Sequence, residues 1–131
     1  MKSMAAIVVV GGLVLQAARP VVAHHAFAAE FDAAKPVKLT GAVTKVDWTN
    51  PHAWIYVDIK DETGKVANWG FELASPNGLM RNGWTRFSLK PGEVVTIEGT
   101  RAKNGSTNAN AAAVIIASTG QKLFAGSSLP Q

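Results

Sequence analysis

The chain contains no cysteine, a single tyrosine and only three histidines among its 131 residues. Without cysteine, a small domain forms neither disulfides nor a thiolate metal site, so its stability has to come from an apolar core. Hydrophobic residues make up 47% of the chain, which is enough for one such core. We find no internal repeat and no linker that would divide the chain, and therefore expect a single domain.

A hydrophobic run long enough for a comfortable membrane span is also absent. The apolar stretch from Ala5 to Leu15 is shorter than the roughly 20 residues that a bilayer requires. Lys2 precedes this stretch, and small residues occupy the positions before a cleavage site after Ala23. We therefore expect residues 1–23 to be a signal peptide and the mature protein to be periplasmic or secreted. An uncleaved membrane anchor is the alternative.

The excess of positive charge is small. The formal net charge is +4, and the removal of Lys2 and Arg19 with the signal peptide lowers it by two. Binding of a nucleic acid requires a clustered basic face. We therefore expect no nucleic-acid partner, although many small β-barrels bind single strands by stacking.

Recognisable catalytic motifs are missing as well. The chain has no nucleophile motif, and the carboxylates of Asp47, Asp58 and Glu72 have no paired spacing. Carboxylates on strand faces are usually just solvated. We therefore expect a protein that is not an enzyme.

Alternation of apolar and polar residues predicts five strands and one short helix. The alternation slips by one residue between Val43 and Val46, which indicates a β-bulge in the first strand. Ser75 and Pro76 are typical of a helix start, and Gly83 of its end. The strands are expected at residues 37–48, 53–60, 66–73, 94–101 and 112–118.

Three strands, a short helix and two more strands is the order of the OB-fold, a five-stranded Greek-key barrel. We therefore predict an all-β OB-like barrel over residues 37–125, with a lead at 24–36 and a loose tail at 126–131. Phe27 and Phe31 have the spacing of a helical turn, but we expect the lead to be extended and pinned to the barrel by their rings. A small sandwich or another meandering barrel is the alternative.

Four short motifs together resemble a known family. They stand at residues 24–27 (His-His-Ala-Phe), 48–52 (Trp-Thr-Asn-Pro-His), 75–77 (Ser-Pro-Asn) and 83–84 (Gly-Trp). The combination is similar to the domain-of-unknown-function 6152 family of small exported bacterial proteins, from His24 to about Ser127. The resemblance implies export and a small β-barrel, and it implies no established activity or catalytic residue.

The three histidines are candidate metal ligands. Cleavage after Ala23 makes His24 the mature N-terminus, where the α-amine and the imidazole chelate a metal together. With His25 and His52 this gives a set of nitrogen ligands that suits copper(II) or nickel, while zinc is also compatible. The alternative is that His24 and His25 are simply the start of the mature chain and that His52 is a turn residue.

Aromatic residues offer a second candidate site. If Ile55, Val57 and Ile59 fill the barrel, Trp54 and Tyr56 point outward on a strand that belongs to the usual ligand-binding face of an OB barrel. The alternative is that the tryptophans seal the ends of the core. The candidate ligand-binding residues are Trp48, Asn50, Trp54, Tyr56 and Trp84.

The sequence therefore predicts an exported binding module of unknown ligand, with copper bound through a mature N-terminal histidine as one hypothesis. A non-catalytic domain that binds a saccharide, a peptide or an envelope component through its aromatic residues is the alternative. The residues identify neither the ligand nor an oligomeric state.

Overall fold

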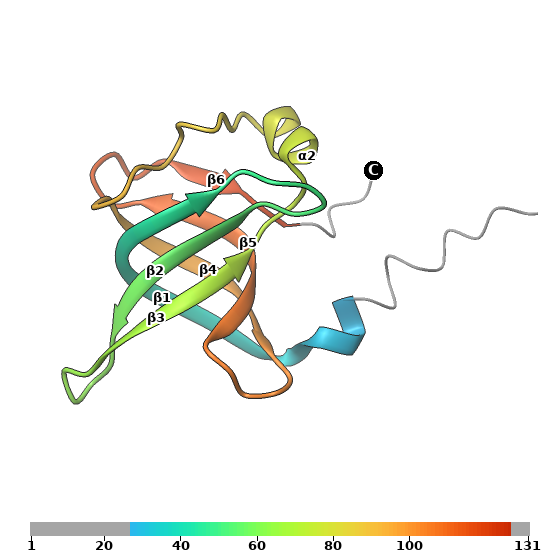
Figure 1. The fold of residues 1–131 in the computed structure, drawn as a ribbon. Helices are drawn as coiled ribbons and strands as arrows, with labels where there is room; N and C mark the ends of the chain where they lie inside the picture. The colour runs from blue at the N-terminus through green and yellow to red at the C-terminus, as the bar shows by residue number, and fades with distance from the viewer. Residues whose placement is uncertain (1–26, 127–131) are drawn as a thin grey trace, which may run out of the picture.

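The computed structural model describes residues 27–126, which form a six-stranded sheet rolled into a barrel (Figure 1). The expected signal peptide at residues 1–23, His24, His25 and most of the expected tail lie outside the described residues. The strands are β1 (Phe31–Asp47), β2 (Trp54–Lys60), β3 (Val66–Glu72), β4 (Val94–Ala102), β5 (Asn108–Ile116) and β6 (Lys122–Phe124), and the helix α2 (Pro76–Arg81) lies between β3 and β4.

The strand pairing confirms the OB-like barrel. Strand β1 runs antiparallel to β2 through its second half and to β4 through its first half. Antiparallel pairs β2–β3 and β4–β5 continue the sheet, and a parallel pairing of β3 with β5 closes it. The short strand β6 adds to β5 outside this five-stranded ring.

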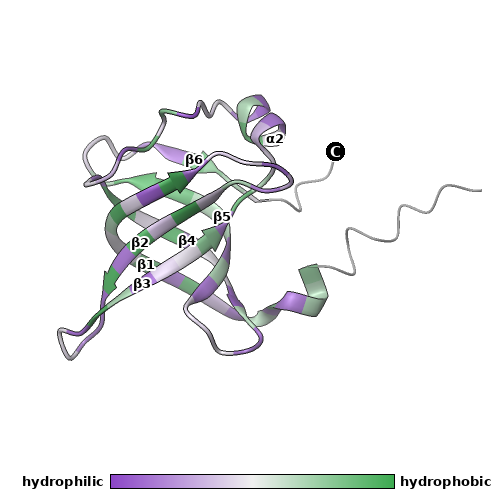
Figure 2. Ribbon diagram, in the orientation of Figure 1, coloured by the Kyte–Doolittle hydropathy of each residue, from purple (hydrophilic) through white to green (hydrophobic). Residues whose placement is uncertain are grey.

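Inward-facing residues of the strands form one core. Along β2, Ile55, Val57 and Ile59 are buried, as the alternation predicts. Hydrophobic and hydrophilic positions alternate along the strands in Figure 2, because neighbouring residues of a strand face opposite sides of the sheet. Phe71 of β3, and Leu73 just after this strand, belong to the same core.

The predicted bulge in β1 is confirmed. The register between β1 and β2 shifts between Val43 and Lys45, which leaves Thr44 without a partner in the ladder. Val43 is buried before the shift, and Val46 packs against the core after it. The extra residue therefore keeps apolar side chains inside on both arms of a strongly bent strand.

The lead is extended from Phe31 onward, as we expected, but it is helical before that residue. Residues 27–30, which we call the lead turn, are helical, and β1 begins at Phe31 rather than at residue 37. The rings of Phe27 and Phe31 lie 5.4 Å apart, as one side of a helical turn allows. The backbone N–H of Lys103 donates to the carbonyl of Glu30 (2.8 Å), so the lead turn is fastened to the loop after β4.

Strand β5 also begins earlier than predicted. Its first residues, Asn108 to Asn110, precede the strand that we predicted at residues 112–118. In the barrel they pair with Gly70, Phe71 and Glu72 of β3. Tertiary pairing therefore makes a strand from residues whose own preferences favour a loop.

Helix α2 has the predicted ends. The Ser75 hydroxyl accepts a hydrogen bond from the Gly78 amide (3.2 Å), Pro76 occupies the first turn, and Gly83 has a φ of 86° just after the helix. Within residues 27–126, no helix is long and apolar enough to cross a membrane.

Candidate ligand-binding face

Two aromatic rings lie side by side on the outside of β2. Because Ile55 and Val57 point inward, Trp54 and Tyr56 point outward, and both are half-buried. Their ring centroids are 6.5 Å apart and their planes differ by 20°. The two ring planes are therefore nearly parallel, and we call this pair of rings the aromatic platform.

Gly70 makes room for this platform. It lies opposite Tyr56 on β3 and next to Asn108 on β5. A Cβ atom at this position would lie 3.4 Å from a Tyr56 ring carbon, 3.6 Å from a Trp54 ring carbon and 2.7 Å from the Asn108 amide oxygen. The absence of a side chain thus lets both rings and the Asn108 amide approach the same point of the sheet.

Polar side chains frame the rings on the outer surface. The Lys45 ammonium lies 5.4 Å above the Tyr56 ring and 3.0 Å from the Asp47 carboxylate. The bond to Asp47 raises the pKa of Lys45. On the next row, the Asn68 amide donates to Asp58 (2.9 Å) and to the Thr44 hydroxyl (3.0 Å). We call the outward side of β2 and β3 the aromatic face; its residues are Trp54, Tyr56, Asp58, Asn68, Gly70 and Glu72.

Glu72 and His52 stand at the edge of the aromatic face. Glu72 is opposite Trp54, and burial raises its pKa, with the nearby Glu30 adding to the effect and His52 opposing it. The His52 Nδ1 atom lies 2.9 Å from the Leu73 carbonyl and 3.7 Å from Glu72 Oε1. Since a carbonyl only accepts, Nδ1 is the donor in the bond to Leu73, and the Nε2 atom is on the other side of the ring.

A hollow of about 390 Å³ lies at the Trp54 end of the platform. It is bounded by three separate parts of the chain, which are the lead turn with the start of β1, the β4–β5 loop and Trp54 itself. We call it the end hollow; its lining residues are Ala29, Glu30, Phe31, Trp54, Ala102, Lys103, Asn104, Ser106 and Asn108.

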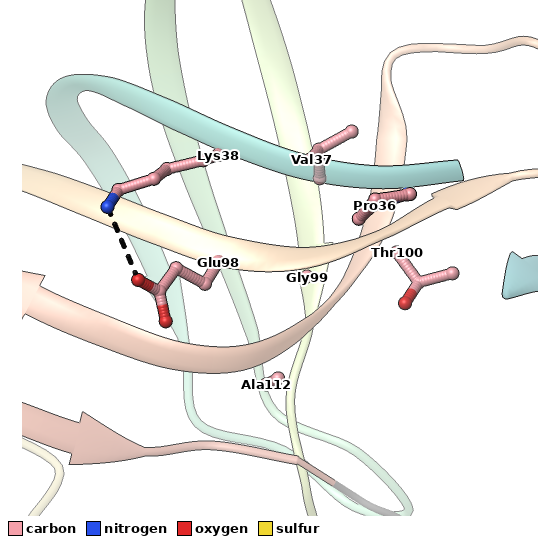
Figure 3. Close-up of a pocket in the computed structure, with 7 residues that line it drawn as sticks. All are labelled: Pro36, Val37, Lys38, Glu98, Gly99, Thr100 and Ala112. Atoms are coloured by element: carbon pink, nitrogen blue, oxygen red, sulfur yellow. Dashed lines mark ion pairs between the residues drawn. The ribbon is translucent and has the colours of Figure 1, made fainter. Parts of the chain in front are cut away.

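A second hollow, of about 460 Å³, lies over β1, β4 and β5 (Figure 3). Lys38 of β1 and Glu98 of β4 pair with each other across it (3.5 Å), and Lys122 also binds Glu98 (2.9 Å). The hydrogen bond and charge of Lys122, with a smaller effect of Lys38, lower the pKa of Glu98. No aromatic side chain lines this hollow, and its charged groups bind each other.

The structure separates the predicted ligand-binding residues into three groups. Trp54 and Tyr56 come together on the aromatic face. Trp48 packs against the core, and Asn50 is exposed in the β1–β2 loop, where its peptide bond to Pro51 is cis. Trp84 is only 3% exposed and belongs to the buried core.

Trp84 instead has a structural place. Its Nε1 donates to the Phe124 carbonyl (2.9 Å), which fastens the segment after α2 to β6. A large ring with one polar group fills the end of the barrel and satisfies a backbone carbonyl there.

Only His52 of the three predicted metal ligands lies within the described part of the chain. His52 lies near Glu72, whereas His24 and His25 precede the first described residue. Residues 27–126 contain no group of three or more His, Cys, Asp or Glu side chains placed to hold a metal ion.

The predicted site residues did not include several members of the site, namely Asp58, Asn68, Gly70, Glu72 and Asn108. Asn68 and Gly70 follow from the alternation of β3, which places them on the same side as Glu72. Asn108 has no comparable signal, because only the β3–β5 pairing brings it beside Gly70.

Comparison with known proteins gives one family and no relatives of known activity. The model of the family of unknown function DUF6152 matches residues 11–111, which is most of the chain. The comparisons with curated proteins and with solved structures give no match. The match spans every strand up to the beginning of β5, together with α2. The chain therefore belongs to the DUF6152 family.

Proposed function

We propose that the protein is an exported, periplasmic binding module that takes up a saccharide on its aromatic face. The observation that carries this proposal is the pair of nearly parallel rings of Trp54 and Tyr56, which both approach Gly70 on the outer surface of the barrel. Outer surfaces of the second and third strands are where OB barrels bind oligosaccharides and oligonucleotides. The expected signal peptide at residues 1–23 supports the export part of the proposal.

The chemistry of the face suits a sugar. A pyranose presents C–H groups on its flat sides and hydroxyl groups around its rim. Aromatic rings offer apolar area for the flat sides, and amide and carboxylate groups such as those of Asn68, Asp58 and Asn108 are suitable partners for hydroxyls. A few polar groups around an apolar floor is the usual composition of a small-molecule site.

The charges of the face argue against a polyanion such as single-stranded nucleic acid. Asp47, Asp58 and Glu72 surround the platform, and the lysine over its ring, Lys45, is already paired with Asp47. A phosphate backbone would meet carboxylates where binding by stacking requires a positively charged groove. A neutral saccharide avoids this repulsion.

Titration of the mature protein with soluble oligosaccharides, including cello- and chito-oligomers and peptidoglycan fragments, tests the proposal. We expect a change in tryptophan fluorescence and a matching calorimetric signal for one class. Trp54→Ala should weaken that binding about tenfold or more, because truncation of a central aromatic contact commonly costs about 2 kcal/mol.

Phe87→Ala is the matched control. Phe87 is an aromatic residue that is 73% exposed and does not belong to the aromatic face. Its loss should leave the affinity unchanged. Absence of any fluorescence or heat signal across the whole panel, or an equal loss in both variants, would contradict saccharide binding on this face.

Copper binding is a second candidate function, and the hydrogen bond of His52 favours it. Histidine ligands of metals usually donate their other ring N–H to a carbonyl or carboxylate, and His52 Nδ1 has such a partner in the Leu73 carbonyl. Nitrogen ligands from His24, His25 and His52 suit copper(II). His24 is three residues before Phe27, a separation of at most about 10 Å along an extended chain.

Calorimetry with copper(II) on protein that begins at His24, beside a form with one additional N-terminal residue, tests this candidate. The amine–imidazole chelate requires a free amine on His24, so the longer form should bind at least tenfold more weakly. His52→Ala in the shorter form should also weaken binding. Equal and weak binding by all three proteins would exclude the site.

A further inference from the structure

The end hollow lies where the aromatic platform stops. Trp54 belongs to both the platform and the end hollow. Tyr56 belongs to the platform alone, since it does not line the hollow. Asn108 lines the hollow as well, and its amide oxygen lies beside Gly70 under the rings. The platform and the hollow therefore form one continuous surface.

We infer that the end hollow receives the terminal unit of a saccharide chain, so that the protein binds chain ends rather than internal segments. This inference rests on the proposed function. It specifies which part of the saccharide is recognised, namely its end, and which residues of the protein select that end.

The lead turn, together with the start of β1, forms the wall that would block a saccharide chain from extending beyond the end hollow. Ala29, Glu30 and Phe31 line the hollow on one side, and the backbone bond from Lys103 to Glu30 holds them against the β4–β5 loop. Phe31 is buried and pairs with Ala102 across the β1–β4 ladder. A wall fixed by a ladder and a backbone hydrogen bond does not move aside for a longer ligand without loss of these contacts.

The lining is suited to the polar end of a sugar chain. Carboxylate, ammonium and amide groups come from Glu30, Lys103 and Asn104. The Ser106 hydroxyl is buried and has no hydrogen-bond partner among the described residues. A bond from this hydroxyl to a ligand in the end hollow would cost no existing hydrogen bond. A volume of about 390 Å³ lies near the lower end of the range of small-ligand sites.

A length series of the saccharide that binds best tests the inference with the full mature protein. A saccharide has one end of the recognised kind per molecule. A protein that binds internal segments can instead bind at every overlapping position along the saccharide. The affinity per mole of chain should therefore rise over the first few units and then stay constant. A molar affinity that keeps growing with chain length would overturn end recognition while leaving the proposed function intact.

A variant of the wall gives a second, independent measurement. Ala29→Trp places a large ring in the end hollow and should weaken binding about tenfold or more. Ala28→Trp is the matched control, since Ala28 is the exposed neighbour and does not line the hollow. Circular dichroism checks that both variants fold. Unchanged affinity in Ala29→Trp would overturn the inference, and absence of saccharide binding by the unmodified protein would overturn the proposed function together with it.

Discussion

Glu72 carries its charge at a position where the fold removes much of the surrounding water. It lies on the aromatic face, yet its side chain is only 13% exposed. Burial is the largest cause of its raised pKa, and the negative charge of Glu30 adds to it. His52 opposes the shift without cancelling it. The folded state therefore holds a proton on Glu72 more tightly than the unfolded chain does.

The sign of the resulting pH dependence follows from linkage. A carboxyl group with a folded-state pKa above its ordinary value of 4.5 stabilises the fold below that value, and this contribution is lost as the pH rises through the raised pKa. Glutamine does not titrate. We therefore expect Glu72→Gln to gain stability relative to the unmodified protein as the pH rises from about 4 to about 7, measured as the free energy of unfolding in urea.

Asp61 provides a control of opposite sign. The hydroxyl of Thr63, together with backbone N–H groups of the β2–β3 turn, lowers its pKa. Its contribution is present at neutral pH and is lost as the pH falls through the lowered pKa, so Asp61→Asn should lose stability relative to the unmodified protein at neutral pH. A Glu72→Gln protein that behaves like Asp61→Asn would show that the charge of Glu72 stabilises the fold.

At the scale of elements, β1 is the strand that both walls of the barrel share. Gly41 pairs with Ile59 of β2 and with Val95 of β4, at the point where one strand serves two ladders. A Cβ atom here would overlap the backbone carbonyl of Asp58 and would lie 2.9 Å from Ile59 Cδ1. Close approach of the backbones therefore requires glycine at this position.

Gly41→Ala should accordingly destabilise the barrel by about 3 kcal/mol or more, because the nearest obstructing atoms belong to the Asp58 backbone carbonyl and cannot rotate away. Denaturant unfolding measures the loss. Gly126→Ala is the matched control, since a Cβ there would make ordinary contacts of 3.7 Å or longer. Stability within about 0.5 kcal/mol of the unmodified protein for both variants would contradict the close approach.

The elements differ in how far the sequence predicted them. Ser75, Pro76 and Gly83 define α2 through local chemistry, and the phase slip after Val43 correctly indicated the bulge. The first residues of β5 escaped prediction because asparagine-rich segments favour loops until a neighbouring strand supplies their hydrogen bonds. The lead turn was wrongly predicted as extended, since the contact between Glu30 and Lys103 that fixes it joins distant parts of the chain.

At the scale of the whole molecule, the candidate site likewise contains residues that the sequence predicted and residues that only distant contacts bring together. Strand parity alone predicted that Trp54 and Tyr56 face outward, and the structure places them together. Strand parity could not predict the burial of Trp84, because this residue lies in a loop. Whether a loop tryptophan covers a core or a ligand depends on what packs around it. Its burial at the end of the barrel follows from the position of β6.

The sequence by itself determined the order of the elements, the inward and outward sides of each strand and the ends of the helix. These properties depend on hydrophobic periodicity and on local turn and cap chemistry, which neighbouring residues carry. Only the tertiary structure decided that Gly70 and Asn108 meet under the aromatic rings and that the lead turn closes the end hollow. Those contacts arise from closure of the barrel, which joins β3 to β5 and the lead turn to the β4–β5 loop, and no local pattern specifies which distant residues a closed sheet brings together.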